Sequence, residues 1–247
     1  MSRENVEVTA PDGICEVTLH VADGDRPAPG VLMIPDAAGS RETIQQMADQ
    51  LASMGYVVLV PDIYYRVGAW APFDVTTLFT DDVERARMSG YARQLTNDRI
   101  VADAHSWVDF LLARPETTGA SIGTTGYCLG GRMSLIIAAG LGNRVAAAAS
   151  FHGGRLAVPD DPTSPHLAAS GITARVYVAG AEEDGSFTPE QAALLNTSLT
   201  EAGVDHTIEI YPARHGFAVA DNPTYDPGAA ARHWTALCNL YAATLPQ

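Results

Sequence analysis

Residues 126–131 read Gly-Tyr-Cys-Leu-Gly-Gly and separate two segments of different character. Residues 122–127 are predicted to be a buried strand, and residues 133–139 belong to a predicted helix. A nucleophile with small residues two positions away on each side fits a sharp turn from strand to helix, where the two backbones nearly touch. The motif therefore predicts an α/β sheet with Cys128 at the tip of such a turn.

Cys128 in this position would begin the helix that follows it. The unpaired N–H groups and the dipole of a helix N-terminus favour a thiolate there. The N–H of Leu129 would face the oxyanion that develops during acyl transfer. The alternative interpretation is a buried free cysteine in a glycine-rich turn, because free cysteine is among the most buried residue types.

The remaining segments alternate between predicted strands and predicted helices. Residues 15–21 alternate apolar and polar side chains, which indicates a half-exposed strand in an antiparallel edge hairpin with residues 6–8. Unbroken apolar segments further along are typical of parallel strands covered on both faces. The pattern predicts one domain over residues 1–247, with a doubly wound, mostly parallel sheet and helices on both faces. The expected buried strands are 30–34, 56–60, 145–151, 174–179 and 206–211, and the expected helices are 44–54, 98–113, 189–201 and 229–243.

One segment, at about residues 63–96, departs from this alternation. It is rich in aromatic residues, arginine and small residues, with little clean periodicity. It follows the carboxyl end of a predicted strand, and open α/β sheets bind their ligands at that end. We expect it to form a cap over the active site.

Composition narrows the class of partner. The formal net charge is −14 and the sequence pI is about 4.7, which argues against nucleic acid and anionic membranes as partners. Three cysteines, without metal-ligand spacing, make a disulfide framework improbable and a reducing cytoplasm the expected location. We expect no metal, no membrane span, a small-molecule partner, and a monomer or small homo-oligomer.

A thiol nucleophile needs a base, and the base needs an acid that orients it. The predicted strand 174–179 leads into Asp184, and the predicted strand 206–211 leads into His215. Nucleophile, acid and base thus follow one another along the chain in the order found in hydrolases with a doubly wound α/β sheet. His215 would take the thiol proton and Asp184 would fix the imidazole tautomer, with Glu183 left open as an alternative acid. His152, after the strand 145–151, is expected to line the pocket.

Three motifs carry a resemblance to a known family. They are residues 60–64 (Val-Pro-Asp-Ile-Tyr), residues 126–131 and residues 215–218 (His-Gly-Phe-Ala). With them the chain resembles, over nearly its whole length, the dienelactone hydrolase family, the carboxymethylenebutenolidase-like branch of the α/β-hydrolases. The resemblance implies the α/β-hydrolase fold and hydrolysis of a small ester or lactone. It also implies a Cys-His-Asp triad, a thioester acyl-enzyme and no cofactor.

The resemblance also implies roles for residues around the triad. The oxyanion hole would be formed by the N–H groups of Leu129 and Ala37. Asp36 stands where the family has a glutamate that holds the resting thiol, and it is one methylene shorter. Phe217, in the histidine motif, is expected to contact substrate.

Two arginines clamp the substrate carboxylate in this family. Arg87 and Tyr91 match the family's Arg-x-x-x-Tyr pattern, and their spacing puts both on one face of a helix. Val219 occupies the position of the second arginine. The resemblance thus implies substrate binding by Arg87 and Tyr91, with half of the charged clamp missing.

Two other functions compete with the hydrolase. The changes at Asp36 and Val219 would suit a non-catalytic small-molecule-binding protein, or pseudoenzyme, on the same fold. A dinucleotide-binding oxidoreductase is disfavoured, because Gly140-Leu141-Gly142 lacks the third glycine of the dinucleotide-binding turn. The ordered triad favours the hydrolase.

Overall fold

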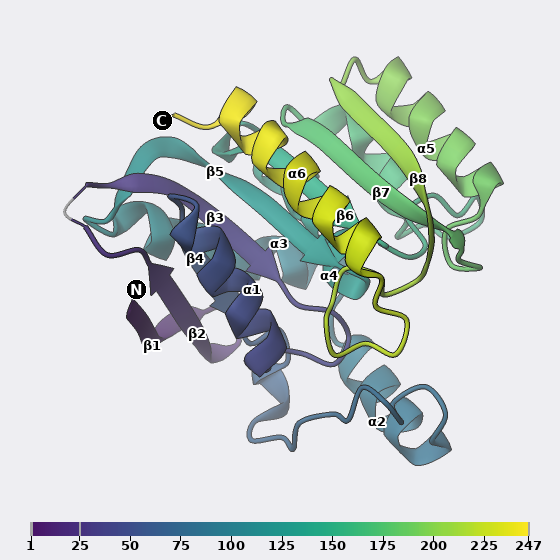
Figure 1. The fold of residues 1–247 in the computed structure, drawn as a ribbon, viewed down its shortest axis with the longest axis horizontal. Helices are drawn as coiled ribbons and strands as arrows, with labels where there is room; N and C mark the ends of the chain where they lie inside the picture. Colours follow the sequence, from purple (N-terminus) through teal and green to yellow (C-terminus); the bar gives the residue numbers. More distant parts are fainter. Residues whose placement is uncertain (1, 25, 247) are drawn as a thin grey trace.

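The computed structural model describes residues 2–24 and 26–246, and in that part of the chain one eight-stranded sheet runs through the molecule (Figure 1). The strand order is β1-β2-β4-β3-β5-β6-β7-β8. The strands are β1 (Ser2–Ala10), β2 (Gly13–Val21), β3 (Ala28–Ile34), β4 (Val57–Pro61), β5 (Thr117–Tyr127), β6 (Val145–Phe151), β7 (Arg175–Glu183) and β8 (His206–Arg214). The helices are α1 (Glu42–Ser53), α2 (Asp82–Ala92), α3 (Asn97–Ala113), α4 (Leu129–Leu141), α5 (Pro189–Glu201) and α6 (Pro227–Thr244), with 3₁₀ turns η1 (Tyr65–Val67), η2 (Gly142–Arg144) and η3 (Pro165–Gly171).

The predicted edge hairpin and parallel sheet are both confirmed. Strands β1 and β2 pair antiparallel, as do β2 and β4, and every pairing from β4 through β3 to β8 is parallel. Parallel neighbours need a crossover, and the helices supply it on both faces of the sheet. Figure 1 shows α1 and α6 on one face, and α3 and α4 on the other.

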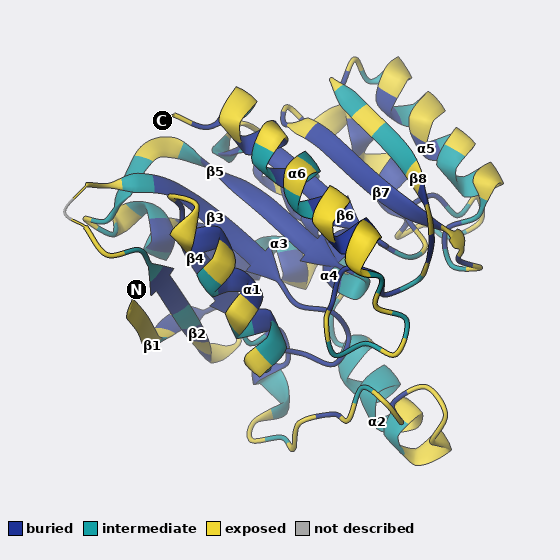
Figure 2. Cartoon of the chain, in the orientation of Figure 1, coloured by how far each residue is buried: buried dark blue, intermediate teal, exposed yellow. Residues whose placement is uncertain are grey.

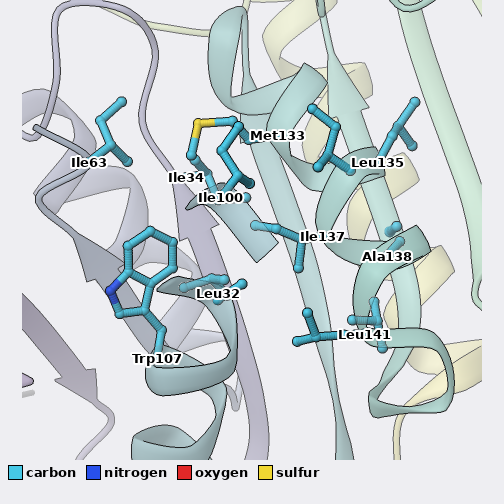
Figure 3. Packing of buried hydrophobic residues seen from close by; sticks show 14 of the residues in the cluster. Leu32, Ile34, Ile63, Ile100, Trp107, Met133, Leu135, Ile137, Ala138 and Leu141 are labelled. Carbon is cyan, nitrogen blue, oxygen red and sulfur yellow. The ribbon is translucent and has the colours of Figure 1, made fainter. Parts of the chain in front are cut away.

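Burial follows this layering. In Figure 2 the central strands are mostly buried, whereas the outer surfaces of the helices are exposed. Successive side chains of β3 point to opposite faces, so Val31 and Met33 pack under α1 and α6 while Leu32 and Ile34 pack under α3 and α4. Figure 3 shows the second of these layers around Trp107 and Met133. Helix α4 is buried along most of its length, which holds its N-terminus, and so Cys128, in place.

Two features differ from the sequence-based expectation. Strands β7 and β8 run on to Glu183 and Arg214, because the two residues pair across the strands after a register shift. The segment expected as a cap contains the helix α2, and every residue of α2 is at least partly exposed. A helix without a buried stripe has no apolar periodicity, which explains why the apolar pattern did not reveal it, although the spacing of Arg87 and Tyr91 suits a helix.

Candidate active site

The turn at Cys128 has the strained geometry that the motif predicts. Cys128 lies between β5 and α4 with φ 53° and ψ −114°. A Cβ atom on Gly126 would lie 2.0 Å from the carbonyl oxygen of Gly130, and one on Gly130 would lie 2.3 Å from the carbonyl oxygen of Ile34. Only glycine fits at either position, and strain of this kind is characteristic of functional sites.

His152 contacts the backbone of Cys128 directly. The N–H of Cys128 is shared between the carbonyl oxygen of Phe151 and Nδ1 of His152, each at 3.1 Å. His152 is 1% exposed, and burial lowers its pKa well below the usual value. Because Nδ1 accepts a hydrogen bond, the proton of this neutral imidazole lies on Nε2.

The ring of His152 is held by aromatic neighbours. Its centroid lies 5.2 Å from that of His215 and 5.0 Å from that of Phe217, in edge-to-face geometry. Phe217 is fully buried, so it supports the His152 ring from behind. Contact of either side chain with substrate stays a prediction.

His215 meets Asp184 at the ends of β7 and β8. Its Nδ1 lies 2.7 Å from Oδ2 of Asp184, and Oδ1 of Asp184 accepts from the N–H and hydroxyl of Ser186 at 2.8 and 2.6 Å. The side chain of Asp184 is 2% exposed, whereas that of Glu183 is 71% exposed and pairs with Arg214 at 3.2 Å. The geometry favours Asp184 over Glu183 as the partner of His215.

The charges around His215 favour its protonated form. Burial lowers the pKa of His215, but a hydrogen bond and negative charge from Cys128, together with the Asp184 carboxylate, raise it to about 10. Burial raises the pKa of Asp184, but its bonds to His215 and Ser186 bring it below the usual value. A histidine that favours its protonated form beside a cysteine is the arrangement that can provide a reactive thiolate.

Exchanging either acid for its amide tests which one orients His215. Asp184→Asn is expected to lower kcat for an ester by roughly 10²-fold or more, because the imidazole loses both its orientation and its stabilising charge. Glu183→Gln, one residue away and exposed, is expected to leave kcat within about twofold. Steady-state kinetics on both variants check this, and equal losses would contradict the assignment of Asp184.

Asp36 lies in the wall of a cavity beside Cys128, but its carboxylate is already engaged. Its two oxygens accept from Arg41 at 2.8 and 3.0 Å, and one also accepts from the N–H of Ala38 at 2.9 Å. Arg41 in turn binds both oxygens of Asp221, at 2.7 Å each. Arg41 thus holds the carboxylate of Asp36 in place, and a role for Asp36 in holding the thiol stays a prediction.

The two expected oxyanion donors lie on either side of Cys128. Leu129 is the first residue of α4, so its N–H has no partner within the helix. Ala37 follows β3 and borders the same cavity as Cys128. The hydroxyl of Tyr64 donates to the carbonyl oxygen of Ala37 at 2.9 Å, which fixes this stretch of backbone.

Arg87 and Tyr91 are committed to contacts within the cap segment. Arg87 bonds to Glu84 at 2.6 Å and to the carbonyl oxygen of Ala71 at 2.8 Å, and its guanidinium lies 4.0 Å from the ring centroid of Phe73. Tyr91 packs against the rings of Tyr64 and Phe73 at 5.5 and 5.7 Å. Substrate binding by Arg87 and Tyr91 stays a prediction, and it would require Arg87 to leave these partners.

Two cavities flank Cys128, and both involve residues that the motifs did not single out. Ser186 carried a signal, because Asp-Gly-Ser is a sequence in which the aspartate bonds to the backbone two residues on. Phe79 carried none, since it lies in the aperiodic segment. The additional lining residues are Ala38, Val75, Leu78, Phe79, Arg132, Gly154, Arg155, Ser186 and Asn222.

Within residues 2–24 and 26–246, no cluster of three or more His, Cys, Asp or Glu side chains is arranged to hold a metal ion. In the same part of the chain no helix combines the length and the hydropathy needed to span a bilayer. Cys15, Cys128 and Cys238 are free thiols.

Comparison with known proteins identifies the family of this chain. The family model of the dienelactone hydrolase family matches residues 17–245. A carboxymethylenebutenolidase of Pseudomonas is 27% identical over 208 residues, which cover 81% of this chain and 79% of the relative.

Solved structures show the same fold. A dienelactone hydrolase-like promiscuous phosphotriesterase from metagenomic libraries has a TM-score of 0.79 and 27% identity, and a dienelactone hydrolase of Anabaena variabilis has a TM-score of 0.67 and 19% identity. Each match covers 99% of both chains. The chain therefore belongs to the dienelactone hydrolase family and is a hydrolase of esters or lactones on an α/β-hydrolase fold.

Proposed function

We propose that this protein hydrolyses a small carboxylic ester or lactone through a covalent thioester on Cys128. The observation that carries the proposal is the 2.7 Å bond between Asp184 and His215, with His215 bordering the same two cavities as Cys128. The three residues come from the ends of β5, β7 and β8, which a parallel sheet brings to one edge. Nucleophile, base and orienting acid are the parts that acyl transfer requires.

The reaction proceeds in two balanced steps. The sulfur of Cys128 attacks the carbonyl carbon and forms a C–S bond, the C–O bond to the leaving alcohol breaks, and His215 gives that oxygen its proton. Water then attacks the thioester carbon while His215 takes a proton from it. The C–S bond breaks, the carboxylic acid leaves, and Cys128 is regenerated.

Backbone groups would stabilise the tetrahedral intermediates of both steps. The N–H groups of Leu129 and Ala37 are the proposed donors to the oxyanion. The N-terminus of α4 adds a favourable field for negative charge at the same point. No cofactor is needed for this chemistry.

We further propose that residues 63–96 act as the cap of a single domain over this site. Three of its side chains, Val75, Leu78 and Phe79, border the cavities beside Cys128. The substrate is a small molecule rather than nucleic acid or membrane, and the chain acts as a monomer or small homo-oligomer. A reducing cytoplasm would keep Cys128 a thiol.

A non-catalytic binding protein explains the site less well. Such a protein needs a pocket, but it does not need the nucleophile in a strained left-handed conformation. Nor does it need His215 beside both a carboxylate and a thiol, because burial of the charged imidazole is unfavourable.

Trapping the thioester tests the proposal. When the enzyme is mixed with 4-nitrophenyl acetate and quenched in acid within the first turnovers, we expect one acetyl group on the peptide that contains Cys128. Mass spectrometry after proteolysis identifies the peptide. Cys238→Ser, which removes a half-buried thiol in α6, is the matched control and should label as the wild type does. Full turnover without acetylated Cys128 at any quench time would eliminate the covalent mechanism.

A further inference from the structure

The two cavities beside Cys128 differ greatly in size. One has a volume of about 20 Å³ and the other about 390 Å³, and Cys128, His215 and Phe79 border both. A cavity of roughly 15 Å³ holds one water molecule, so the smaller one has room for little more than a methyl group. The larger one falls in the range of about 300–1,000 Å³ that is usual for ligand sites.

The small cavity is bordered by the cap segment and by a proposed oxyanion donor. Its lining includes Ala37 together with Val75 and Leu78 of the cap segment. Leu78 is 1% exposed, so its side chain is packed in place. A carbonyl oxygen directed toward Ala37 would leave room beside it for only a short acyl chain.

The large cavity is an open groove whose surface is almost entirely carbon. Phe79, which is 52% exposed, and Leu129 contribute apolar side chains. Arg132 and Arg155 also border the groove, but their charged ends are engaged with other groups. The guanidinium of Arg132 donates to the carbonyl oxygens of Arg155 and Thr163, and that of Arg155 pairs with Asp161 at 3.1 Å.

The proposed nucleophile and general acid serve both cavities. Cys128 and His215 border the small cavity and the groove alike, so the proton of His215 can reach a group in either. Ala37, a proposed oxyanion donor, borders only the small cavity. Because the acyl carbonyl must reach Ala37, the acyl group is placed in the small cavity, and the groove is left for the leaving alcohol.

The charges of the residues that the resemblance implies for substrate binding also favour a neutral substrate. Arg87 is already paired with Glu84. Val219, at the position where the resemblance implies a second arginine, is fully buried. Position 219 therefore carries no charge, and the charge of Arg87 is already paired, so neither position offers a free cation to a substrate carboxylate.

We infer that, given the cysteine mechanism proposed above, the substrate is a neutral ester with a short acyl group and a bulky apolar alcohol. The groove binds the alcohol through its carbon surface, and Val75, Leu78 and Phe79 limit the length of the acyl chain. Each methylene buried in the groove should raise kcat/KM by about two- to fourfold.

Two ester series with equal intrinsic reactivity test the inference. In methyl to hexyl acetates, kcat/KM is expected to rise with each methylene of the alcohol. In methyl acetate to methyl hexanoate, it is expected to fall by at least about tenfold beyond propionate, because the acyl chain meets the cap. A flat alcohol series, or a rise along the acyl series, would overturn the inference.

Variants of the cap segment test whether its side chains limit the length of the acyl chain. Val75→Ala is expected to relax the acyl limit and leave the alcohol series rising, and Leu78→Ala serves as a second variant if the first has too small an effect. Phe79→Ala, which opens both cavities, should flatten the alcohol series as well. Val83→Ala, on the exposed surface of α2, is the matched control and should reproduce both wild-type series.

The same assays separate this inference from the proposed mechanism. If Cys128→Ala retains full turnover, the cysteine mechanism fails whatever the chain-length profile. If Cys128→Ala is inactive but the wild type prefers long acyl chains or anionic esters, the mechanism stands and the inferred substrate class is wrong.

Discussion

Cys128→Ala is expected to lower kcat/KM for an activated ester by at least about 10⁴-fold while leaving the fold intact. In the proposed mechanism, the sulfur is the atom that forms the bond to substrate. The loss should be in kcat. Alanine fits the turn because it is smaller than cysteine, so thermal unfolding should change little.

The variant has a second readout that does not depend on activity. Negative charge on Cys128 helps to raise the pKa of His215 to about 10. Removing the sulfur removes that contribution, so the pKa of His215 should fall, and NMR titration of the imidazole measures it. Cys238→Ala is the control, since it should change neither activity nor the titration of His215. An unchanged His215 pKa in Cys128→Ala would show that the two side chains are not coupled.

Local rules predicted the geometry of the turn at Cys128, because its main constraints act over a few residues. Gly126 and Gly130 must be glycine wherever a strand turns this sharply into a helix, and the contacts of 2.0 and 2.3 Å that any Cβ would make confirm it. Asp184 and His215 follow successive parallel strands, and parallel strands end at one edge of the sheet. The loops that carry them could therefore be derived from strand order, whereas the choice between Asp184 and Glu183 needed the structure.

Contacts between distant segments could not be predicted in this way. Arg41 binds Asp36 and Asp221, which are separated by 185 positions of sequence, and nothing local to either acid indicates the pairing. Arg87 matches a substrate-binding pattern, but its partners Glu84 and Phe73 come from the cap itself. The size of the two cavities likewise depends on how the aperiodic segment packs, which only the structure reveals.

Gly130→Ala is expected to destabilise the protein by about 3 kcal/mol or more, measured as the free energy of unfolding in denaturant. The new Cβ would lie 2.3 Å from the carbonyl oxygen of Ile34 and 2.4 Å from that of Pro35. Both obstacles are backbone atoms at the end of β3, so relief requires moving α4 away from the sheet. Such a shift would also separate Leu129 from Ala37, and kcat should fall in whatever fraction remains folded.

Gly90→Ala is the matched control for the same substitution in a different setting. Gly90 lies in α2, and its Cβ would meet the side chain of Arg93 at an ordinary 3.7 Å. Because alanine loses less backbone entropy than glycine on entering a helix, this variant should gain about 0.5–1 kcal/mol. If the free energy of unfolding falls in Gly130→Ala and rises in Gly90→Ala, the loss at Gly130 comes from the contact between α4 and β3. Equal free energies of unfolding for the two variants would mean that the backbones of α4 and β3 can separate freely. The strained turn would then not be what holds Cys128 at the edge of the sheet.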